Sequence, residues 1–274
     1  MSGPAAPAAQ WETLYRAIAQ QLPDLKVEVV AELDSTNSEL MRRARVGRMD
    51  AVLLVAQRQT AGRGRLGRQW YSHPEAAGDA TAPVAATKAL AALTFSLGLP
   101  LAPRDWSGLS LVVGLALAET LSPLIQLKWP NDLWLEDRML AGILLETASF
   151  GEGGAVRRYV VIGIGINLGP RAATGLSTAP AWLHEVRPGV DAAQVLVEIA
   201  APLVQAVRLF ETHGFAPFQA RFNARDALRD RAVLLSDGTA GTAHGVSEAG
   251  ALLVHTALGM QVVTSSEVSV RPAA

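Results

Sequence analysis

The sequence contains no cysteine among its 274 residues. This absence excludes disulfides, thiolate zinc sites and thiol nucleophiles. The sequence also shows no secretory signal, because its Ala/Pro-rich start over 1–10 has no basic region followed by an apolar run. The most apolar stretch, 108–127, is interrupted by Glu119 and Pro123, which favours a buried helix over a membrane span. We therefore expect a cytoplasmic protein without a membrane segment.

The chain has little excess charge and few lysines. Its 24 basic and 25 acidic residues leave a net charge of −1, which argues against a protein that coats nucleic acid. Only three of the basic residues are lysines, Lys26, Lys88 and Lys128. A mechanism that needs a lysine amine therefore has three candidates.

The hydrophobic pattern predicts a mixed α/β fold, with a central β-sheet that carries helices and a small β-barrel after it. We expect a disordered tail over 1–10, a main domain over 11–227 and a small C-terminal domain over 228–274. Thr36 and Glu39 have the spacing of a capping box. Helices are predicted over 11–22, 38–46, 109–121 and 192–213. Strands are predicted over 27–33, 51–56, 92–97, 125–129, 133–135, 140–145, 159–166, 232–236, 241–246, 252–256, 260–263 and 267–270.

The loop over 59–70 is the strongest candidate for a binding site. It holds three arginines, three glycines and no acidic residue. Glycine lets a backbone approach a ligand closely, and arginine offers forked donors to phosphate and carboxylate oxygens. Gly62, Gly64 and Gly67 match the letters of a dinucleotide fingerprint, but the residues that follow do not begin a helix. A loop that closes over an anion is thus one interpretation, and a solvated basic turn is the other.

Each of three further motifs can be explained by a binding site or by local structure alone. Residues 128–132 end a strand with a cation, an amide and a carboxylate, suited to phosphate and Mg²⁺ or to a simple turn. Gly163 and Gly165 interrupt a buried strand, so either a flat ligand or a helix approaches the backbone there. Residues 35–37 can bind a polar head group or cap a helix. The five histidines show no metal-ligand spacing.

Together and in this order, five motifs resemble the biotin protein ligases. They are Ser35-Thr36-Asn37, Gly62-Arg63-Gly64-Arg65-Leu66-Gly67-Arg68-Gln69-Trp70, Lys128-Trp129-Pro130-Asn131-Asp132, Ala141-Gly142-Ile143-Leu144-Leu145-Glu146 and Gly163-Ile164-Gly165-Ile166-Asn167. The resemblance covers about residues 30–170 and continues more weakly into the tail, where it implies an SH3-like C-terminal domain. It implies an enzyme that uses Mg·ATP to convert biotin to biotinyl-5′-AMP. The biotinyl group then passes to a lysine of the biotin carboxyl carrier protein of acetyl-CoA carboxylase.

The resemblance also implies roles for single residues. The catalytic residues are Arg63, Arg65, Arg68 and Lys128. Biotin is bound by Ser35, Thr36, Asn37, Gln59, Gly62, Arg63, Gly64, Arg65, Gly142, Gly163 and Gly165. ATP is bound by Arg65, Arg68, Trp70, Lys128, Asn131, Asp132 and Asn167, with Mg²⁺ at Asp132.

The sequence departs from the family pattern at three places. Met139 stands where the family has a lysine before Leu-Ala-Gly, and a thioether carries no charge. The segment over 73–91 is longer than the family's link, and about 30 residues precede residues 35–37, too few for the DNA-binding domain of the bifunctional branch. We therefore expect a monofunctional ligase that binds neither operator DNA nor membranes. A weak biotin or biotinyl-adenylate binder and a lipoate ligase stay open as alternatives, as does a homodimer through an edge strand.

Overall fold

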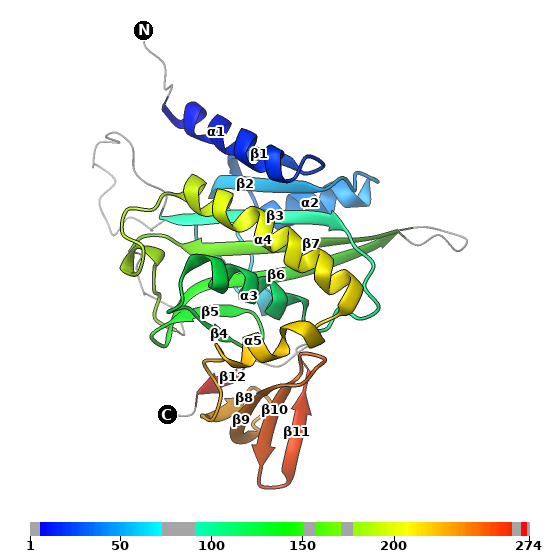
Figure 1. Cartoon of the computed structure of the whole chain (residues 1–274), viewed down its shortest axis with the longest axis vertical. Helices are drawn as coiled ribbons and strands as arrows, with labels where there is room; N and C mark the ends of the chain where they lie inside the picture. The colour runs from blue at the N-terminus through cyan, green and yellow to red at the C-terminus, as the bar shows by residue number, and fades with distance from the viewer. Residues whose placement is uncertain (1–5, 73–90, 151–156, 171–177, 265–269, 273–274) are drawn as a thin grey trace. The chain divides into compact units, whose positions relative to one another are not determined.

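The computed structural model describes residues 6–72, 91–150, 157–170, 178–264 and 270–272 (Figure 1). The chain divides into two compact units. Unit 1 comprises Met1–Pro100 and Arg138–Ala201, and unit 2 comprises Leu101–Asp137 and Pro202–Ala274. Each unit is described by itself.

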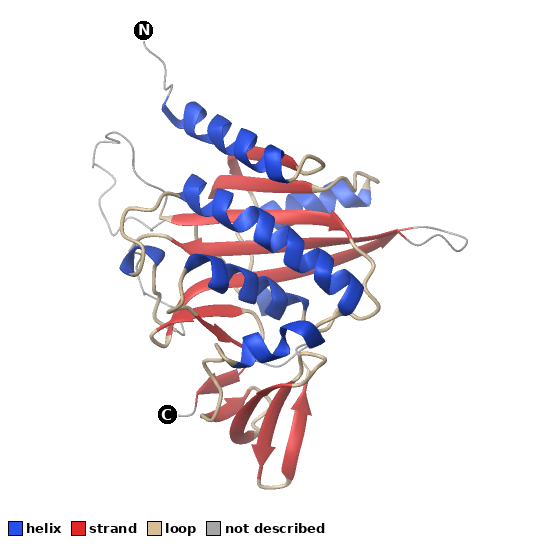
Figure 2. Ribbon diagram, viewed as in Figure 1, coloured by secondary structure: helices blue, strands red, loops and turns tan. Residues whose placement is uncertain are grey.

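Unit 1 is built on a mixed sheet whose strands follow the order β1-β2-β3-β7-β6, labelled in Figure 1 and drawn in red in Figure 2. The β1–β2 pair is parallel, and the pairs β2–β3, β3–β7 and β7–β6 are antiparallel. The strands are β1 (Lys26–Leu33), β2 (Val52–Gln59), β3 (Ala92–Pro100), β6 (Arg138–Phe150) and β7 (Arg157–Asn167). The helical elements are α1 (Ala6–Gln21), α2 (Thr36–Arg45) and the 3-10 turns η1 (Arg65–Gly67) and η2 (Leu183–Glu185).

Helix α2 covers one face of this sheet and begins beside the predicted site. Its N-cap is Ser35, which has extended backbone dihedrals and accepts a hydrogen bond from the Ser38 amide at 3.4 Å. The predicted capping box therefore starts one residue too late, because Thr36 is already helical. Leu40 and Ala44 pack against sheet residues such as Leu54, so α2 is fixed by apolar burial.

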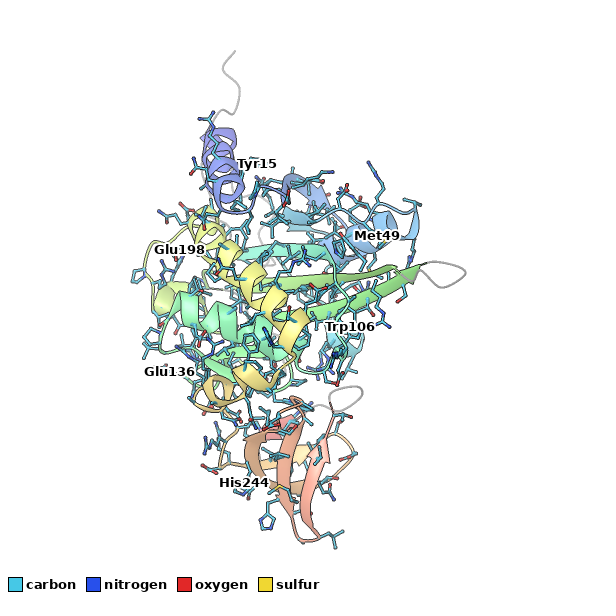
Figure 3. All side chains as sticks on the ribbon, turned by 45° about the vertical axis from the view of Figure 1, so that its right-hand side comes forward. Tyr15, Met49, Trp106, Glu136, Glu198 and His244 are labelled. Carbon is cyan, nitrogen blue, oxygen red and sulfur yellow. The ribbon has the colours of Figure 1, made fainter. Side chains whose placement is uncertain are left out.

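Unit 2 contains a short hairpin-like pair of strands, three helical elements and a five-stranded antiparallel sheet of order β11-β10-β9-β8-β12. Its first part comprises α3 (Leu109–Leu121), β4 (Gln126–Lys128) and β5 (Asp132–Leu135), followed by η3 (Ala216–Phe218) and α5 (Gln219–Asn223). The C-terminal strands are β8 (Ala232–Leu235), β9 (Ala240–Val246), β10 (Leu252–Thr256), β11 (Gly259–Val263) and β12 (Val270–Pro272). His244 lies on this sheet in Figure 3, where Glu136 marks the turn after β5.

Helix α4 (Ala192–His213) runs from unit 1 into unit 2. By length and composition alone it could cross a membrane, but half of its most apolar window is buried within the structure. A core helix of a soluble protein has the same character. Gly214 follows α4 with a φ of +67°, which confirms the predicted glycine C-cap.

The predicted mixed α/β fold, with a separate antiparallel sheet at the C-terminus, is confirmed. The predicted bounds of α3 and α4 agree with the structure. Helix α1 begins at Ala6, so residues 6–10 are helical where we predicted a disordered tail. The segment 73–90 lies outside the described residues.

Candidate functional site

A row of small residues crosses the α2 face of the unit 1 sheet. Ala56 of β2, Thr94 of β3, Gly165 of β7 and Gly142 of β6 are paired directly across the antiparallel strands. Residues paired in this way point to the same face of a sheet. We call this set the small-residue row. Its members have short side chains or none, so little projects from the sheet face along it.

A hydrogen-bonded polar cluster lies beside the row, under the start of α2. Gln59 Oε1 accepts from the backbone N–H of Thr36 at 2.8 Å and from its Oγ1 at 3.1 Å. Ser96 Oγ lies 2.6 Å from both Thr36 Oγ1 and Asn37 Oδ1. Ser96 donates its single proton to Asn37 Oδ1, since an amide oxygen can only accept. Thr36, Asn37 and Ser96 are almost wholly buried, so the cluster is a fixed polar wall.

Glu146 joins this wall to the arginine-rich loop. Its carboxylate accepts from Asn37 Nδ2 at 2.9 Å through Oε2 and from Arg63 Nη2 at 2.9 Å through Oε1. Arg63 also donates to Ser38 Oγ at 3.3 Å. Asn37 Nδ2 additionally donates to the Leu144 carbonyl at 3.3 Å. The amide of Asn37 is therefore committed to protein partners, and its part in the site is to hold the wall.

The loop over 62–70 returns on itself and places an indole on the small-residue row. Trp70 N donates to the Gly62 carbonyl at 2.9 Å, and Gly64 N donates to the Arg68 carbonyl at 2.7 Å. A Cβ at Gly165 would collide with the indole of Trp70. A Cβ at Gly163 would collide with the Asn37 amide. Both glycines thus make room for side chains of the protein itself, with Trp70 standing over the row.

Met139 and Asn167 lie at the β6 end of the row. A Cβ at Gly142 would lie 3.0 Å from the Met139 methyl group, so the thioether lies beside this glycine. Asn167 is 2% exposed and donates to the carbonyls of Met139 and Ala181 at 3.1 and 3.0 Å. Both amide protons of Asn167 are therefore used to fix the backbone of the site. Arg138, the neighbour of Met139, forms two hydrogen bonds with the Glu185 carboxylate, so its charge is already paired.

Unit 2 presents a second group of polar residues at the turn between β4 and β5. Lys128 Nζ lies 3.4 Å from Asp132 Oδ2, and both side chains are mostly buried. The amine also lies 5.1 Å from the ring centre of Trp134. The intervening Trp129 is fully buried and donates through Nε1 to the Gly250 carbonyl at 3.1 Å, which anchors the turn to the C-terminal sheet. Lys128, Asn131 and Asp132 therefore stand on a rigid support within unit 2.

The charge state of Asp34 is fixed next to the polar cluster. Arg42 donates to both of its oxygens, at 2.6 and 2.9 Å, and lowers the pKa of Asp34 to about 2. Asp34 also accepts from the Ser35 amide at 2.8 Å, so this carboxylate holds the residue that caps α2.

The structure brings many of the predicted biotin-site residues together in unit 1. Thr36, Asn37, Gln59 and Arg63 belong to one hydrogen-bonded network that includes Ser96 and Glu146. Ser96 and Thr94 could not be predicted, because a polar residue inside an apolar strand gives no signal in the sequence. Glu146 belongs to the Ala141–Glu146 motif, but nothing in the sequence indicates its partners. Among the described residues no group of three His, Cys, Asp or Glu is placed to hold a metal ion.

Comparison with known proteins identifies the class to which this fold and site belong. Residues 31–167 match the sequence model of the Biotin/lipoate A/B protein ligase family, and the chain belongs to this family. Residues 232–271 match the Biotin protein ligase C terminal domain, which narrows the class to the biotin protein ligases.

Named relatives and a solved structure agree with this placement. The chain is 34% identical over 269 residues to the bifunctional ligase/repressor BirA of Escherichia coli K12, covering 94% of this chain and 78% of the relative. It is 32% identical over 251 residues to the biotin–[acetyl-CoA-carboxylase] ligase of Paracoccus denitrificans, covering 88% and 98%. The biotin protein ligase from Aquifex aeolicus in complex with biotin and ATP superposes with a TM-score of 0.71 at 26% identity, covering 90% of this chain and 99% of that one.

Proposed function

We propose that the small-residue row and its polar wall bind biotin in an enzyme that joins biotin to protein with ATP. The chain is a biotin protein ligase, which forms biotinyl-5′-AMP and transfers the biotinyl group to a lysine of a carrier protein. The observation that carries the site assignment is the buried network of Thr36, Gln59 and Ser96 beside a row without bulky side chains. A flat ring with polar edges fits such a surface, because its face needs a low floor and its edge needs fixed donors and acceptors.

The arginine-rich loop supplies the positive charge that the first step needs. Biotin carboxylate attacks the α-phosphate of ATP, so two anions must approach each other. Arg63, Arg65 and Arg68 carry three positive charges on one short loop, and guanidinium groups bind carboxylate and phosphate oxygens in pairs. Fixed charge of this kind stabilises both the encounter and the charge that develops on the phosphate.

Lys128, Asn131 and Asp132 serve the phosphates in this proposal. Mg²⁺ is held in such enzymes by one or two carboxylates together with substrate phosphates. One carboxylate at Asp132 with the amide of Asn131 beside it fits that donor set, and Lys128 supplies a cation on the same turn. A Mg²⁺ ion held at Asp132 would neutralise phosphate charge, while Lys128 and Asn131 orient the nucleotide.

The carrier and the setting are parts of the same proposal. The acceptor is the biotin carboxyl carrier protein of acetyl-CoA carboxylase, and the reaction takes place in the cytoplasm. The SH3-like domain extends over 228–274 and follows the main domain, to which helix α1 belongs from Ala6 onward. Strand β1 ends the order of the unit 1 sheet, and pairing of two β1 strands would form a homodimer. Sedimentation of the free protein at increasing concentration tests for this dimer.

The intact mass of a biotin carboxyl carrier domain tests the function directly. After incubation with the protein, biotin and Mg·ATP, the domain should gain one biotinyl group, and it should gain none without ATP. Arg65→Ala should reduce pyrophosphate release about 10²-fold, the usual cost of removing one transition-state donor. Arg48→Ala removes an exposed arginine outside the loop and should leave the rate unchanged. Equal rates in Arg65→Ala and the parent would remove the loop from the mechanism.

Met139 favours a second candidate, a weak biotin or biotinyl-adenylate binder. The residue lies beside Gly142 at the end of the small-residue row, where a charged amine is absent. Binding of biotin without any release of pyrophosphate from Mg·ATP would support this candidate over the enzyme. The lipoate ligase alternative is disfavoured by the match to the biotin protein ligase C-terminal domain.

A further inference from the structure

We propose that Thr94 binds the substrate, with its hydroxyl donating a hydrogen bond to the ring sulfur of biotin. Thr94 belongs to none of the sequence motifs and lies in the middle of the small-residue row. The inference deepens the proposed function and rests on it.

The hydroxyl of Thr94 is buried and lacks a partner among the described residues. Thr94 is 4% exposed, and its Oγ1 has no hydrogen bond within that part of the chain. A buried hydroxyl without a partner costs free energy, because it has given up its bonds to water. Such groups are rare in native proteins, and a bound ligand is one of the explanations they call for.

The surroundings of Thr94 direct this hydroxyl toward the binding surface. Its cross-strand neighbours on the same face are Ala56 on one side and Gly165 on the other. Neither neighbour has a side chain that reaches over Thr94, so neither of them occupies the space above its hydroxyl. The indole of Trp70 lies against Gly165 and adds an apolar surface there. The Thr94 hydroxyl is therefore a polar group among apolar neighbours at this point of the row, which suits a largely apolar part of the ligand.

The spacing along β3 selects the end of the biotin ring system that reaches Thr94. Ser96, in the polar wall, and Thr94 lie on the same face, two residues and roughly 6.6 Å apart along the strand. Biotin carries its ureido group and its ring sulfur at opposite ends of two fused rings. The ureido group needs polar partners, and the wall of Thr36, Gln59 and Ser96 is the polar part of this face. The ring sulfur, a weak acceptor, then lies next to the Thr94 hydroxyl.

Binding of biotin and desthiobiotin, which lacks the ring sulfur, tests the proposal. Calorimetry without ATP is carried out on the parent, Thr94→Val and Thr94→Ser. We expect Thr94→Val to weaken biotin binding about fivefold, the effect of one modest hydrogen bond. Desthiobiotin should bind the parent and Thr94→Val equally well. Thr94→Ser keeps the hydroxyl and should retain most of the affinity for biotin.

The melting temperature of each free protein separates binding from folding. Thr94→Val removes an unpartnered hydroxyl at nearly constant volume, so its melting temperature should equal or exceed that of the parent. Equal biotin affinity in Thr94→Val and the parent would overturn the proposal, as would an equal loss for both ligands. Failure of the parent itself to bind biotin would instead overturn the proposed function, and this inference with it.

Discussion

Asp226 is a carboxyl group that folding removes from water. It is 8% exposed, and burial raises its pKa to about 6, against which the hydrogen bond from the Leu228 amide works only in part. Between about pH 4 and pH 6 the folded protein holds a proton that the unfolded chain has lost. Stability from this group is therefore present at low pH and lost as the pH rises through 6, by about 3 kcal/mol for a shift of two units.

Asp226→Asn should remove this pH dependence. We expect its free energy of unfolding to change less between pH 4 and pH 7 than that of the parent, measured by urea titration at both values. Asp24→Asn, at an exposed carboxyl, is the matched control and should follow the parent. The raised pKa of Asp226 would be contradicted if the parent gained stability relative to Asp226→Asn between pH 4 and pH 7.

Met139 is the second residue whose chemistry can be changed alone. Met139→Lys places an amine beside Gly142, at the position where the resemblance implies a lysine. We expect adenylate formation to rise about tenfold, equivalent to about 1.4 kcal/mol in the barrier. Met139→Leu has a similar size and no charge, so it should show no gain. An unchanged rate in Met139→Lys would mean that the loop arginines already balance the substrate charge.

At the scale of elements, the ion pair between Arg63 and Glu146 ties the arginine-rich loop to β6. Glu146→Gln keeps an acceptor for Asn37 and removes the charge that holds Arg63. A half-exposed ion pair contributes about 0.2–1 kcal/mol, so the loop should open up to about fivefold more often. Trypsin should then cut the free protein faster after Arg63, Arg65 and Arg68, as mass spectrometry of the released peptides would show.

Glu32→Gln is the matched control for this loop experiment. It removes an ion pair with Arg58 between β1 and β2 that involves none of the three arginines of the loop. Cleavage within the loop should not change in this variant. Equal cleavage rates in Glu146→Gln and the parent would show that the backbone bonds of the loop, such as Trp70 to Gly62, hold it without the ion pair.

Sequence patterns predicted those elements that have a clear period or a sharp end. Helices α3 and α4 were predicted at their observed bounds, because apolar residues and Gly214 define them locally. In the candidate site, the arginine-rich loop stood out by its residue types alone, whereas Thr36, Asn37 and Gly163 were predicted only through the resemblance of the five ordered motifs. Ser96 and Thr94 were missed, since a polar residue in a buried strand acquires meaning only through strands far away in sequence. Glu146 lies 109 residues beyond Asn37, and such a contact follows from folding alone.

At the scale of the whole molecule, the burial of Lys128 has a consequence for self-labelling. An enzyme that makes an activated acyl group can acylate its own amines when that group escapes. Lys128 is 11% exposed with Asp132 beside its amine, whereas Lys26 is 62% exposed. Incubation with biotin and Mg·ATP in the absence of a carrier should therefore label Lys26 and spare Lys128, as peptide mapping would show. Because the chain has only three lysines, escaped biotinyl-5′-AMP finds few lysine amines on the enzyme itself.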